Sequence, residues 1–162
     1  MDNGPITSVY FSPTGTTRRV VEGIIAGMRG RGRPFMLDVT KKARRYDSAR
    51  ELKAGPVILA APVYYGRIPE AAAEYFNSLA GSGTPAVIVV VYGNRAYDDA
   101  LIELYDIAVR RGFVPVAAGA FIGEHSYSTE IIPAAAGRPD VKDIEAARAF
   151  GKAVQEKLLG CG

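Results

Sequence analysis

Cysteine and histidine are almost absent from this chain of 162 residues. Cys161 is the single cysteine and His125 is the single histidine. One cysteine cannot form a disulfide within the chain, and one of each cannot supply the clusters that hold structural metals. We therefore expect neither a disulfide framework nor a metal site.

Long apolar runs are missing as well. No stretch approaches the roughly 20 residues that a transmembrane helix requires, and no charged segment followed by an apolar one begins at Met1. We expect a cytoplasmic protein that is not embedded in a membrane. The chain is long enough to bury a proper core, and no repeat or linker divides it, so a single domain over residues 1–162 is expected.

Two common phosphate-binding motifs are absent too. The chain contains no Gly-x-x-x-x-Gly-Lys-Ser/Thr, which argues against a nucleotide triphosphate P-loop. It also contains no Gly-x-Gly-x-x-Gly after its first apolar run. A hydroxyl-rich turn follows that run instead, formed by Ser12, Pro13, Thr14, Gly15, Thr16 and Thr17. Hydroxyls beside the exposed N–H groups of a helix start favour a bound dianion, so a phosphate cradle is predicted. The alternative is an ordinary helix N-cap preceded by turn residues.

Positive charge is concentrated in the first third of the chain, although the formal net charge is only +3. Residues 18–53 carry eleven Lys and Arg against four Asp and Glu. Such a face can attract nucleic acid or an acidic protein partner. No aromatic interleaving or nucleic-acid motif accompanies the charge, so a solvated surface is the simpler interpretation and nucleic acid is not expected as a partner.

Apolar strand-like segments alternate with helical patterns along the chain. The runs at 56–61 and 86–91 show no polar alternation, which is typical of strands covered on both faces. The pattern predicts an α/β fold, a doubly wound parallel sheet with helices on both faces, whose ligands bind at the carboxyl ends of the strands. Strands are predicted at 6–11, 34–39, 56–61, 86–91 and 113–122, and helices begin near Thr16, Pro69, Asp98 and Asp140.

Aromatic residues gather in the loops after the third and fourth predicted strands. A flat heteroaromatic ring can stack between such side chains, each stacked pair contributing about 0.5–1.5 kcal/mol beyond burial. The alternative is that these tyrosines merely cover the sheet edge. The residues of the two loops are Pro62, Val63, Tyr64, Tyr65 and Gly66, then Tyr92, Gly93, Asn94 and Tyr97.

These motifs resemble those of flavodoxins. Residues 12–17 fit Ser/Thr-x-Thr-Gly-x-Thr, the loop that holds the FMN phosphate, and residues 92–97 are similar to the Gly-x-Gly-Asp-x-x-Tyr loop, with Asn94 in place of Asp. The resemblance implies a five-stranded sheet of order 2-1-3-4-5. It also implies that Tyr97 stacks on the flavin and that Tyr64 or Tyr65 is the aromatic of the other loop.

A closer likeness is to the flavodoxin portion of proteins that join a flavodoxin to a bacterial-type ferredoxin. It runs through residues 11–17, 62–64, 92–99, 124–126 and 137–140, but no Cys-x-x-Cys-x-x-Cys cluster follows. The chain is then either a stand-alone relative or a shortened form. A phosphoacceptor receiver domain or a low-molecular-weight phosphatase would need carboxylates or a Cys after the first strand, and neither is present there.

The resemblance implies an FMN cofactor and low-potential electron transfer to a redox protein partner such as ferredoxin or an oxidoreductase. The alternative is an FMN-dependent reductase of quinones or NAD(P)H. No catalytic side chain is assigned, and Gly66 is expected to let a nearby backbone carbonyl reach the flavin N5–H. The long segment from Gly123 to Pro139 is expected to be functional. Its His125 either contacts the flavin or a substrate oxygen, or is a surface residue.

Overall fold

The computed structural model describes residues 4–30, 32–45, 51–52, 54–124 and 135–160. Strands and helices alternate along these residues, because apolar runs of four to nine residues are separated by amphipathic ones. In chain order the elements are β1 (Thr7–Tyr10), α1 (Thr16–Met28), β2 (Phe35–Asp38), α2 (Lys42–Arg45), β3 (Val57–Pro62), α3 (Glu70–Asn77), β4 (Pro85–Tyr92), α4 (Ala100–Arg110), β5 (Val114–Ile122) and α5 (Val141–Gly160).

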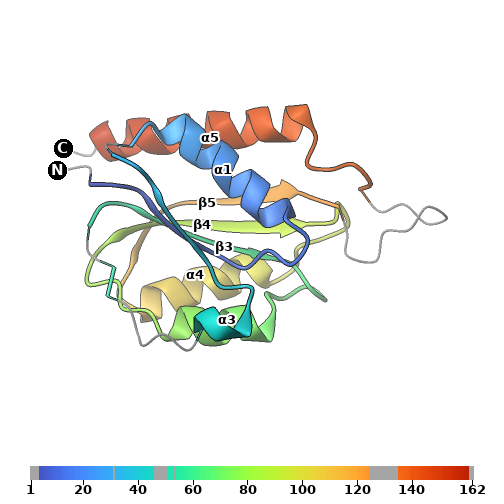
Figure 1. Ribbon diagram of the computed structural model, residues 1–162, viewed down its shortest axis with the longest axis horizontal. Coiled ribbons are helices and arrows are strands. Elements are labelled where there is room, and N and C mark those ends of the chain that lie inside the picture. The colour runs from blue at the N-terminus through green and yellow to red at the C-terminus, as the bar shows by residue number, and fades with distance from the viewer. Residues whose placement is uncertain (1–3, 31, 46–50, 53, 125–134, 161–162) are drawn as a thin grey trace.

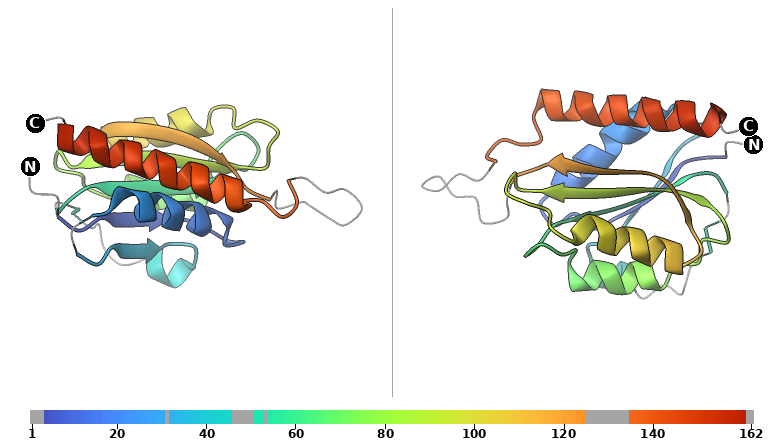
Figure 2. Two further views of the ribbon diagram at one scale, coloured as in Figure 1. Left: turned by 90° about the horizontal axis from the view of Figure 1, so that it is seen from above. Right: turned by 180° about the vertical axis from the view of Figure 1, so that it is seen from behind.

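The strands form one parallel sheet in the order β2-β1-β3-β4-β5, which confirms the predicted fold class. Helices α1 and α5 cover one face, and α3 and α4 cover the other (Figure 1; Figure 2). This layering follows from right-handed crossovers, which place successive helices on either side of a parallel sheet. All strands therefore end at the same edge.

The core has two halves, one on each side of the sheet. Every residue of β3 is buried, and β4 is buried from Ala86 to Val91, as predicted for central strands. Phe76, Leu79 and Leu104 fill the half beneath α3 and α4. The other half lies beneath α1 and α5, where the predicted stripe of α5 is buried at Ala147, Gly151 and Val154.

Helices α1 and α5 approach each other closely through glycines. A Cβ on Gly27 would lie 2.0 Å from the carbonyl oxygen of Arg148, and one on Gly151 would lie 2.0 Å from that of Ile24. Only glycine fits at such a contact, because no side chain can occupy the space taken by the opposite backbone. The two helices are thus held backbone to backbone.

The ends of these two helices follow from local residues. Helix α1 ends at Met28, and Arg29 follows in the left-handed region at φ +46°. Gly30, the next residue, packs closely, since a Cβ there would lie 2.7 Å from the side chain of Ile6. Asp140 caps α5 as predicted: its carboxylate accepts the N–H of Asp143 at 3.0 Å.

Membrane-spanning helices and clusters of metal-binding side chains are both absent from the described residues. No helix among them is long and apolar enough to cross a membrane. They also contain no group of three or more His, Cys, Asp or Glu side chains placed to hold a metal ion.

Candidate functional site

The loops that follow β1, β3, β4 and β5 meet in one narrow groove at the carboxyl edge of the sheet. This convergence is a consequence of the parallel topology, which brings those strand ends to the same side (Figure 1). The groove is lined by Thr14, Thr16, Pro62, Val63, Tyr64, Val91, Tyr92, Gly93, Gly123 and Glu124.

The loop after β1 is held in shape by Ser12. The Ser12 N–H donates to the hydroxyl of Thr40 at 2.8 Å, and the Ser12 hydroxyl accepts the N–H of Arg18 at 3.0 Å. Gly15, at φ +82°, occupies the N-cap position of α1 without a capping side chain. A left-handed N-cap of this kind is tolerated by glycine and turns the chain sharply into the helix.

This loop leaves hydrogen-bond donors unused. Among the described residues, the N–H groups of Thr16 and Thr17 have no hydrogen-bond partner, as expected for the first turn of a helix without a side-chain cap. The Thr17 side chain is fully buried, and its hydroxyl also lacks a partner in that part of the chain. The hydroxyls of Thr14 and Thr16 lie 3.3 Å apart at the groove. Buried polar groups normally find partners, so this arrangement suits a bound anion.

The loop after β3 is a tight turn over residues 64–67. The N–H of Tyr64 donates to the carbonyl of Arg67 at 2.7 Å, and the N–H of Arg67 donates back to Tyr64 at 3.1 Å. The two central residues, Tyr65 and Gly66, have φ of +52° and +74°, which is the geometry of a type I′ turn. Tyr64 faces the groove, and burial raises the pKa of its phenol.

The turns after β3 and β4 are fastened together at Gly66. The Gly66 carbonyl accepts the N–H of Asp99 at 3.1 Å. A Cβ on Gly66 would lie 2.7 Å from a carboxylate oxygen of Asp98, so the Asp98 side chain packs directly on the glycine. Gly66 is therefore required for both its positive φ and its close contact.

Two tyrosines form the wall supplied by the loop after β4. Tyr92 and Tyr97 pack edge to face, with ring centroids 5.3 Å apart and planes at 72°. Tyr92 lines the groove, whereas Tyr97 is not among the lining residues and is 38% exposed. Asn94 lies between them in the chain at φ +59°, a conformation that asparagine tolerates better than most residues.

The loop after β5 closes the groove on its far side. The Gly123 N–H donates to the carbonyl of Tyr92 at 2.9 Å, and a Cβ on Gly123 would lie 2.7 Å from Val91 and 3.2 Å from Thr16. The absence of a side chain thus lets this loop reach the loop after β1. His125 lies outside the described residues.

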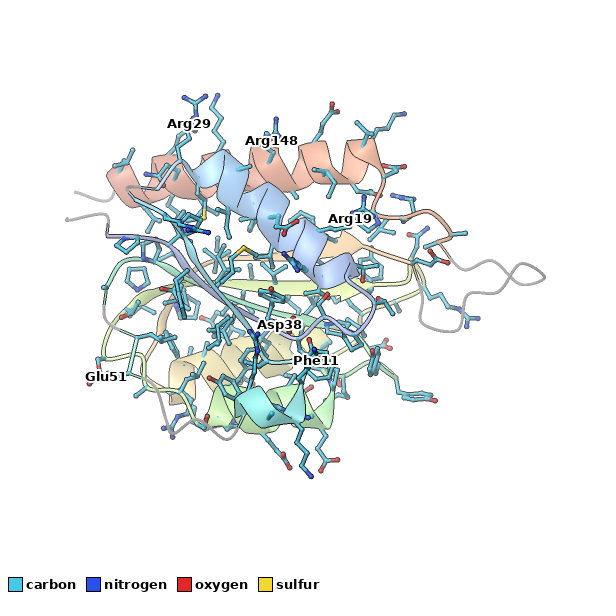
Figure 3. All side chains as sticks on the ribbon, viewed as in Figure 1. Phe11, Arg19, Arg29, Asp38, Glu51 and Arg148 are labelled. Atoms are coloured by element: carbon cyan, nitrogen blue, oxygen red, sulfur yellow. The ribbon has the colours of Figure 1, made fainter. Side chains whose placement is uncertain are left out.

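Several arginines around the site are already bound to other groups. Arg67 donates to the Glu103 carboxylate from Nε at 2.8 Å and from Nη2 at 2.9 Å. Arg138 likewise donates two hydrogen bonds to the carboxylate of Asp143. These hydrogen bonds lower the pKa of Asp143, and their effect is larger than that of burial, which raises it. Arg19, labelled in Figure 3, donates to the carbonyl of Pro139 at 2.9 Å and ties α1 to the start of α5.

The candidate residues from the sequence divide into two groups. Those that line the groove are Thr14, Thr16, Pro62, Val63, Tyr64, Tyr92 and Gly93. Ser12, Pro13, Gly15, Thr17, Tyr65, Gly66, Asn94 and Tyr97 lie in the same loops but are not among its lining residues. Sequence reasoning missed Thr40 and Val91. Thr40 could have been identified from the sequence, because it follows a predicted strand that ends at the same edge. Val91 could not, because it lies within a buried apolar strand.

Comparisons with known proteins gave structural matches only. No protein-family model matches the sequence, and no curated protein does. The chain is similar to a flavodoxin, WrbA-like protein from Agrobacterium tumefaciens (16% identity, TM-score 0.66, 95% of this chain and 96% of that one). It is also similar to oxidised flavodoxin 2 from Bacillus cereus (16%, 0.65, 94% and 99%) and to an NADH:FMN oxidoreductase in its apo form (12%, 0.63, 94% and 89%). At such identities the likeness shows the fold alone, and the protein has the flavodoxin-like fold.

Proposed function

We propose that this chain is a single-domain FMN-binding protein for low-potential electron transfer. The observation that carries the proposal is the set of unused donors at the start of α1, where Thr17 keeps a buried hydroxyl without a described partner. Leaving such a group unbonded costs about 1–3 kcal/mol, so a ligand oxygen at this position would be stabilising. A helix start rich in hydroxyls fits the phosphate of FMN.

The side chains in the rest of the groove are of the kinds that stack against a flat ring. Tyr64 and Tyr92 line it from two loops, and Pro62, Val63 and Val91 add apolar walls. Such walls exclude water and offer aromatic surface for stacking. We infer that the ring lies among these side chains, with Tyr97 supporting Tyr92 at 5.3 Å.

FMN, when bound, supplies the redox chemistry, and the chain sets its energetics. Apolar and aromatic walls disfavour additional negative charge on the ring, because charge in a dry site is poorly solvated. This favours a low potential. We propose that a backbone carbonyl of the turn at residues 64–67 would accept a hydrogen bond from the N5–H of the ring, with Gly66, at φ +74°, permitting the necessary change of conformation.

The partners follow from this role. We propose a redox protein such as ferredoxin or an oxidoreductase as the electron donor or acceptor, and a relationship to the flavodoxin portion of ferredoxin-fused proteins. A second candidate is a reductase of quinones or NAD(P)H, which is supported by the structural likeness to an NADH:FMN oxidoreductase. Rapid reduction of the bound flavin by NADPH alone would decide for this second function.

The decisive experiment compares two buried hydroxyls. Thr17 and Ser8 both keep a buried hydroxyl without a described partner, but Ser8 lies within β1 and away from the loop of residues 12–17. Thr17→Val removes the hydroxyl that we assign to phosphate, whereas Ser8→Ala is the matched control. Affinities for FMN and for riboflavin, which lacks the phosphate, are measured by fluorescence quenching on the apoprotein.

We expect Thr17→Val to weaken FMN binding by about 10- to 100-fold, since hydrogen bonds to charged groups contribute about 1.5–3 kcal/mol. Riboflavin binding should change less than twofold in this variant, and Ser8→Ala should alter neither affinity. Thr17→Val should also raise the thermal stability of the apoprotein, because an unpaired buried hydroxyl is removed. The proposal would be refuted if the purified protein is colourless and the apoprotein quenches no FMN fluorescence.

A further inference from the structure

A compact basic cluster lies beside the loop of residues 12–17. We define the basic cluster as Lys41, Lys42, Arg44 and Arg45, which make up most of α2 and the residue before it. Lys41, Lys42 and Arg44 are exposed, and α2 contains no acidic residue. Four positive charges therefore lie within five consecutive positions of the surface.

Two contacts place this cluster next to the candidate site. Thr40, directly before it, accepts the N–H of Ser12 at 2.8 Å. The guanidinium carbon of Arg45 lies 5.9 Å from the ring centroid of Phe11, which precedes Ser12 in the chain. Figure 3 labels Phe11 and Asp38 close to α2 on this side of the molecule. The cluster thus borders the loop after β1, the loop whose Thr14 and Thr16 line the groove.

The cluster differs from the other basic residues at this edge. Arg18 pairs with Glu22 at 2.9 Å, and Arg67 pairs with Glu103 at 2.8 Å. In contrast, within the described ranges no carboxylate lies in ion-pair reach of Lys41, Arg44 or Arg45.

Two acidic side chains lie in the neighbourhood but do not cancel the cluster. The Asp38 carboxylate accepts the N–H of Thr40 at 2.9 Å, and Glu74 shares a recess between α2 and α3 with Lys42 and Arg45. Lys41, Arg44 and Arg45 alone carry three positive charges against these two, so the field beside the loop of residues 12–17 is net positive.

The fold gains little from this arrangement. No residue of α2 is buried, so the helix adds little to the core. Its like charges stand three and four positions apart, where they repel one another. Because this repulsion destabilises the fold, we explain the cluster by its effect on other molecules. A positive field raises the local concentration of acidic molecules and speeds their association.

We propose that the basic cluster is the docking surface for an acidic electron-carrier protein, which exchanges electrons with the flavin of the adjacent site. This inference rests on the proposed function and specifies its partner by charge. The cluster is less suited to single-stranded nucleic acid than to an acidic protein. Binding of single strands uses exposed aromatic rings, and the Phe11 ring beside the cluster is buried beneath Arg45.

The test reverses charge at two places. Lys41→Glu/Arg44→Glu changes the cluster by four units, and the neutral variant Lys41→Gln/Arg44→Gln changes it by two. Arg148→Glu/Lys152→Glu is the matched control, because it makes the same change on exposed positions of α5, far from Phe11 (Figure 3). FMN affinity is measured first for every variant, and all should bind FMN within twofold of the parent.

The probe is an acidic plant-type [2Fe–2S] ferredoxin, whose binding to the FMN-loaded protein is measured by calorimetry at 20 and 300 mM NaCl. We expect binding by the parent to weaken about tenfold or more at the higher salt, as charge-steered association does. The Glu double variant should lose at least tenfold in affinity at low salt, the Gln variant should lose less, and the α5 control should stay within twofold.

A kinetic readout reports the charge at the point of electron exit. Two ferricyanide ions, each reduced from Fe(III) to Fe(II), reoxidise one FMNH2, and its two protons pass to the solvent. The rate constant should fall as salt rises in the parent, because the anion is attracted, and this dependence should vanish or reverse in Lys41→Glu/Arg44→Glu.

Each other result overturns the inference. Equal losses in the cluster variant and the α5 control would show that net charge alone matters. Tighter binding of a single-stranded DNA 20-mer than of ferredoxin, or a raised KM for NADPH with unchanged ferredoxin binding, would assign the cluster to another anion. If no variant binds FMN, the proposed function fails, while ferredoxin binding to the apoprotein still tests the docking surface.

Discussion

The two helical layers support the two ends of the candidate site in different ways. On one face, α1 and α5 meet backbone to backbone through Gly27 and Gly151, and α1 carries the hydroxyl loop at its start. On the other face, α3 and α4 pack through large side chains such as Phe76 and Leu104, and the loops that lead into them carry the tyrosines. The loop at the start of α1 is thus fixed by backbone contacts between helices, and the tyrosine loops are fixed by turns.

This difference suggests a division of tasks. Close backbone packing leaves little freedom, which suits the placement of hydrogen-bond donors within tenths of an ångström. Side-chain packing tolerates more adjustment, which under the proposed function would suit a ring that changes its redox state. Substitutions on the two faces should therefore have different consequences.

Gly27→Ala should have the largest effect. The added Cβ would lie 2.0 Å from the Arg148 carbonyl, so α1 and α5 must separate. We expect a loss of about 3 kcal/mol or more in urea unfolding of the apoprotein, together with weaker FMN binding as the start of α1 shifts. Gly23→Ala is the control, since its Cβ would lie 3.1 Å from the Ala147 side chain and alanine favours helix, and it should stay within about 1 kcal/mol. Equal effects would remove the basis of the comparison.

Gly66→Ala should have the next largest effect, on the opposite face. A positive φ of +74° in a non-glycine residue costs about 1–2 kcal/mol, and contact with the Asp98 side chain adds to it. In an Asp98→Ala background the added cost should shrink, because the carboxylate contact is removed and only the strain and the contact with the Cβ of residue 98, 2.9 Å away, remain. Chemical denaturation of the four proteins measures this. Identical costs in both backgrounds would mean that the contact with Asp98 is unimportant.

Asp143→Asn should give a smaller loss that depends on pH. Arg138 and the N–H of Asp140 lower the pKa of Asp143 below its usual value of 3.8. A carboxyl whose pKa is lower in the folded state stabilises it fully above its unfolded pKa, and this contribution disappears as pH falls through the folded pKa. The stability difference between parent and variant should be constant from neutral pH to about pH 5 and should shrink below 3.8. Thermal unfolding across this range tests the sign, and Glu156→Gln at an exposed pair serves as control.

Tyr65→Asn should have the smallest effect on stability. The side chain is 88% exposed, and asparagine accepts the positive φ of this position, so the change should be within about 0.5 kcal/mol. FMN affinity should fall less than threefold, whereas Tyr64→Ala should lower it by about tenfold through lost stacking. Fluorescence titration separates the two, and a larger loss for Tyr65→Asn would assign the ring contact to Tyr65.

Much of the fold was predictable, because burial leaves direct marks in the sequence. The unbroken apolar runs of β3 and β4 identified central strands, and Asp140 marked the start of α5. The close contact of Gly30 with Ile6, just after the end of α1, was not predictable. A glycine can stop a helix or allow close packing, and the sequence pattern alone does not distinguish these uses.

The candidate site was predictable as a set of loops but not as a set of contacts. Motifs singled out residues 12–17, 62–66 and 92–97, and parallel topology implied that these loops share an edge. The hydrogen bond between Thr40 and Ser12, which joins residues 28 positions apart, has no signature in the sequence. Likewise, Tyr64 and Tyr65 are equivalent in the sequence, and only the turn directs Tyr64 into the groove.

Composition and periodicity by themselves determined that the chain forms a layered α/β sheet with a hydroxyl-rich turn at the edge where ligands bind, because apolar period and turn chemistry act over short distances. The tertiary structure alone decided which charges are neutralised, which tyrosine lines the groove and which hydroxyl is left buried without a described partner. These properties depend on the distances between segments far apart in the chain, and such distances exist only once the layers have packed.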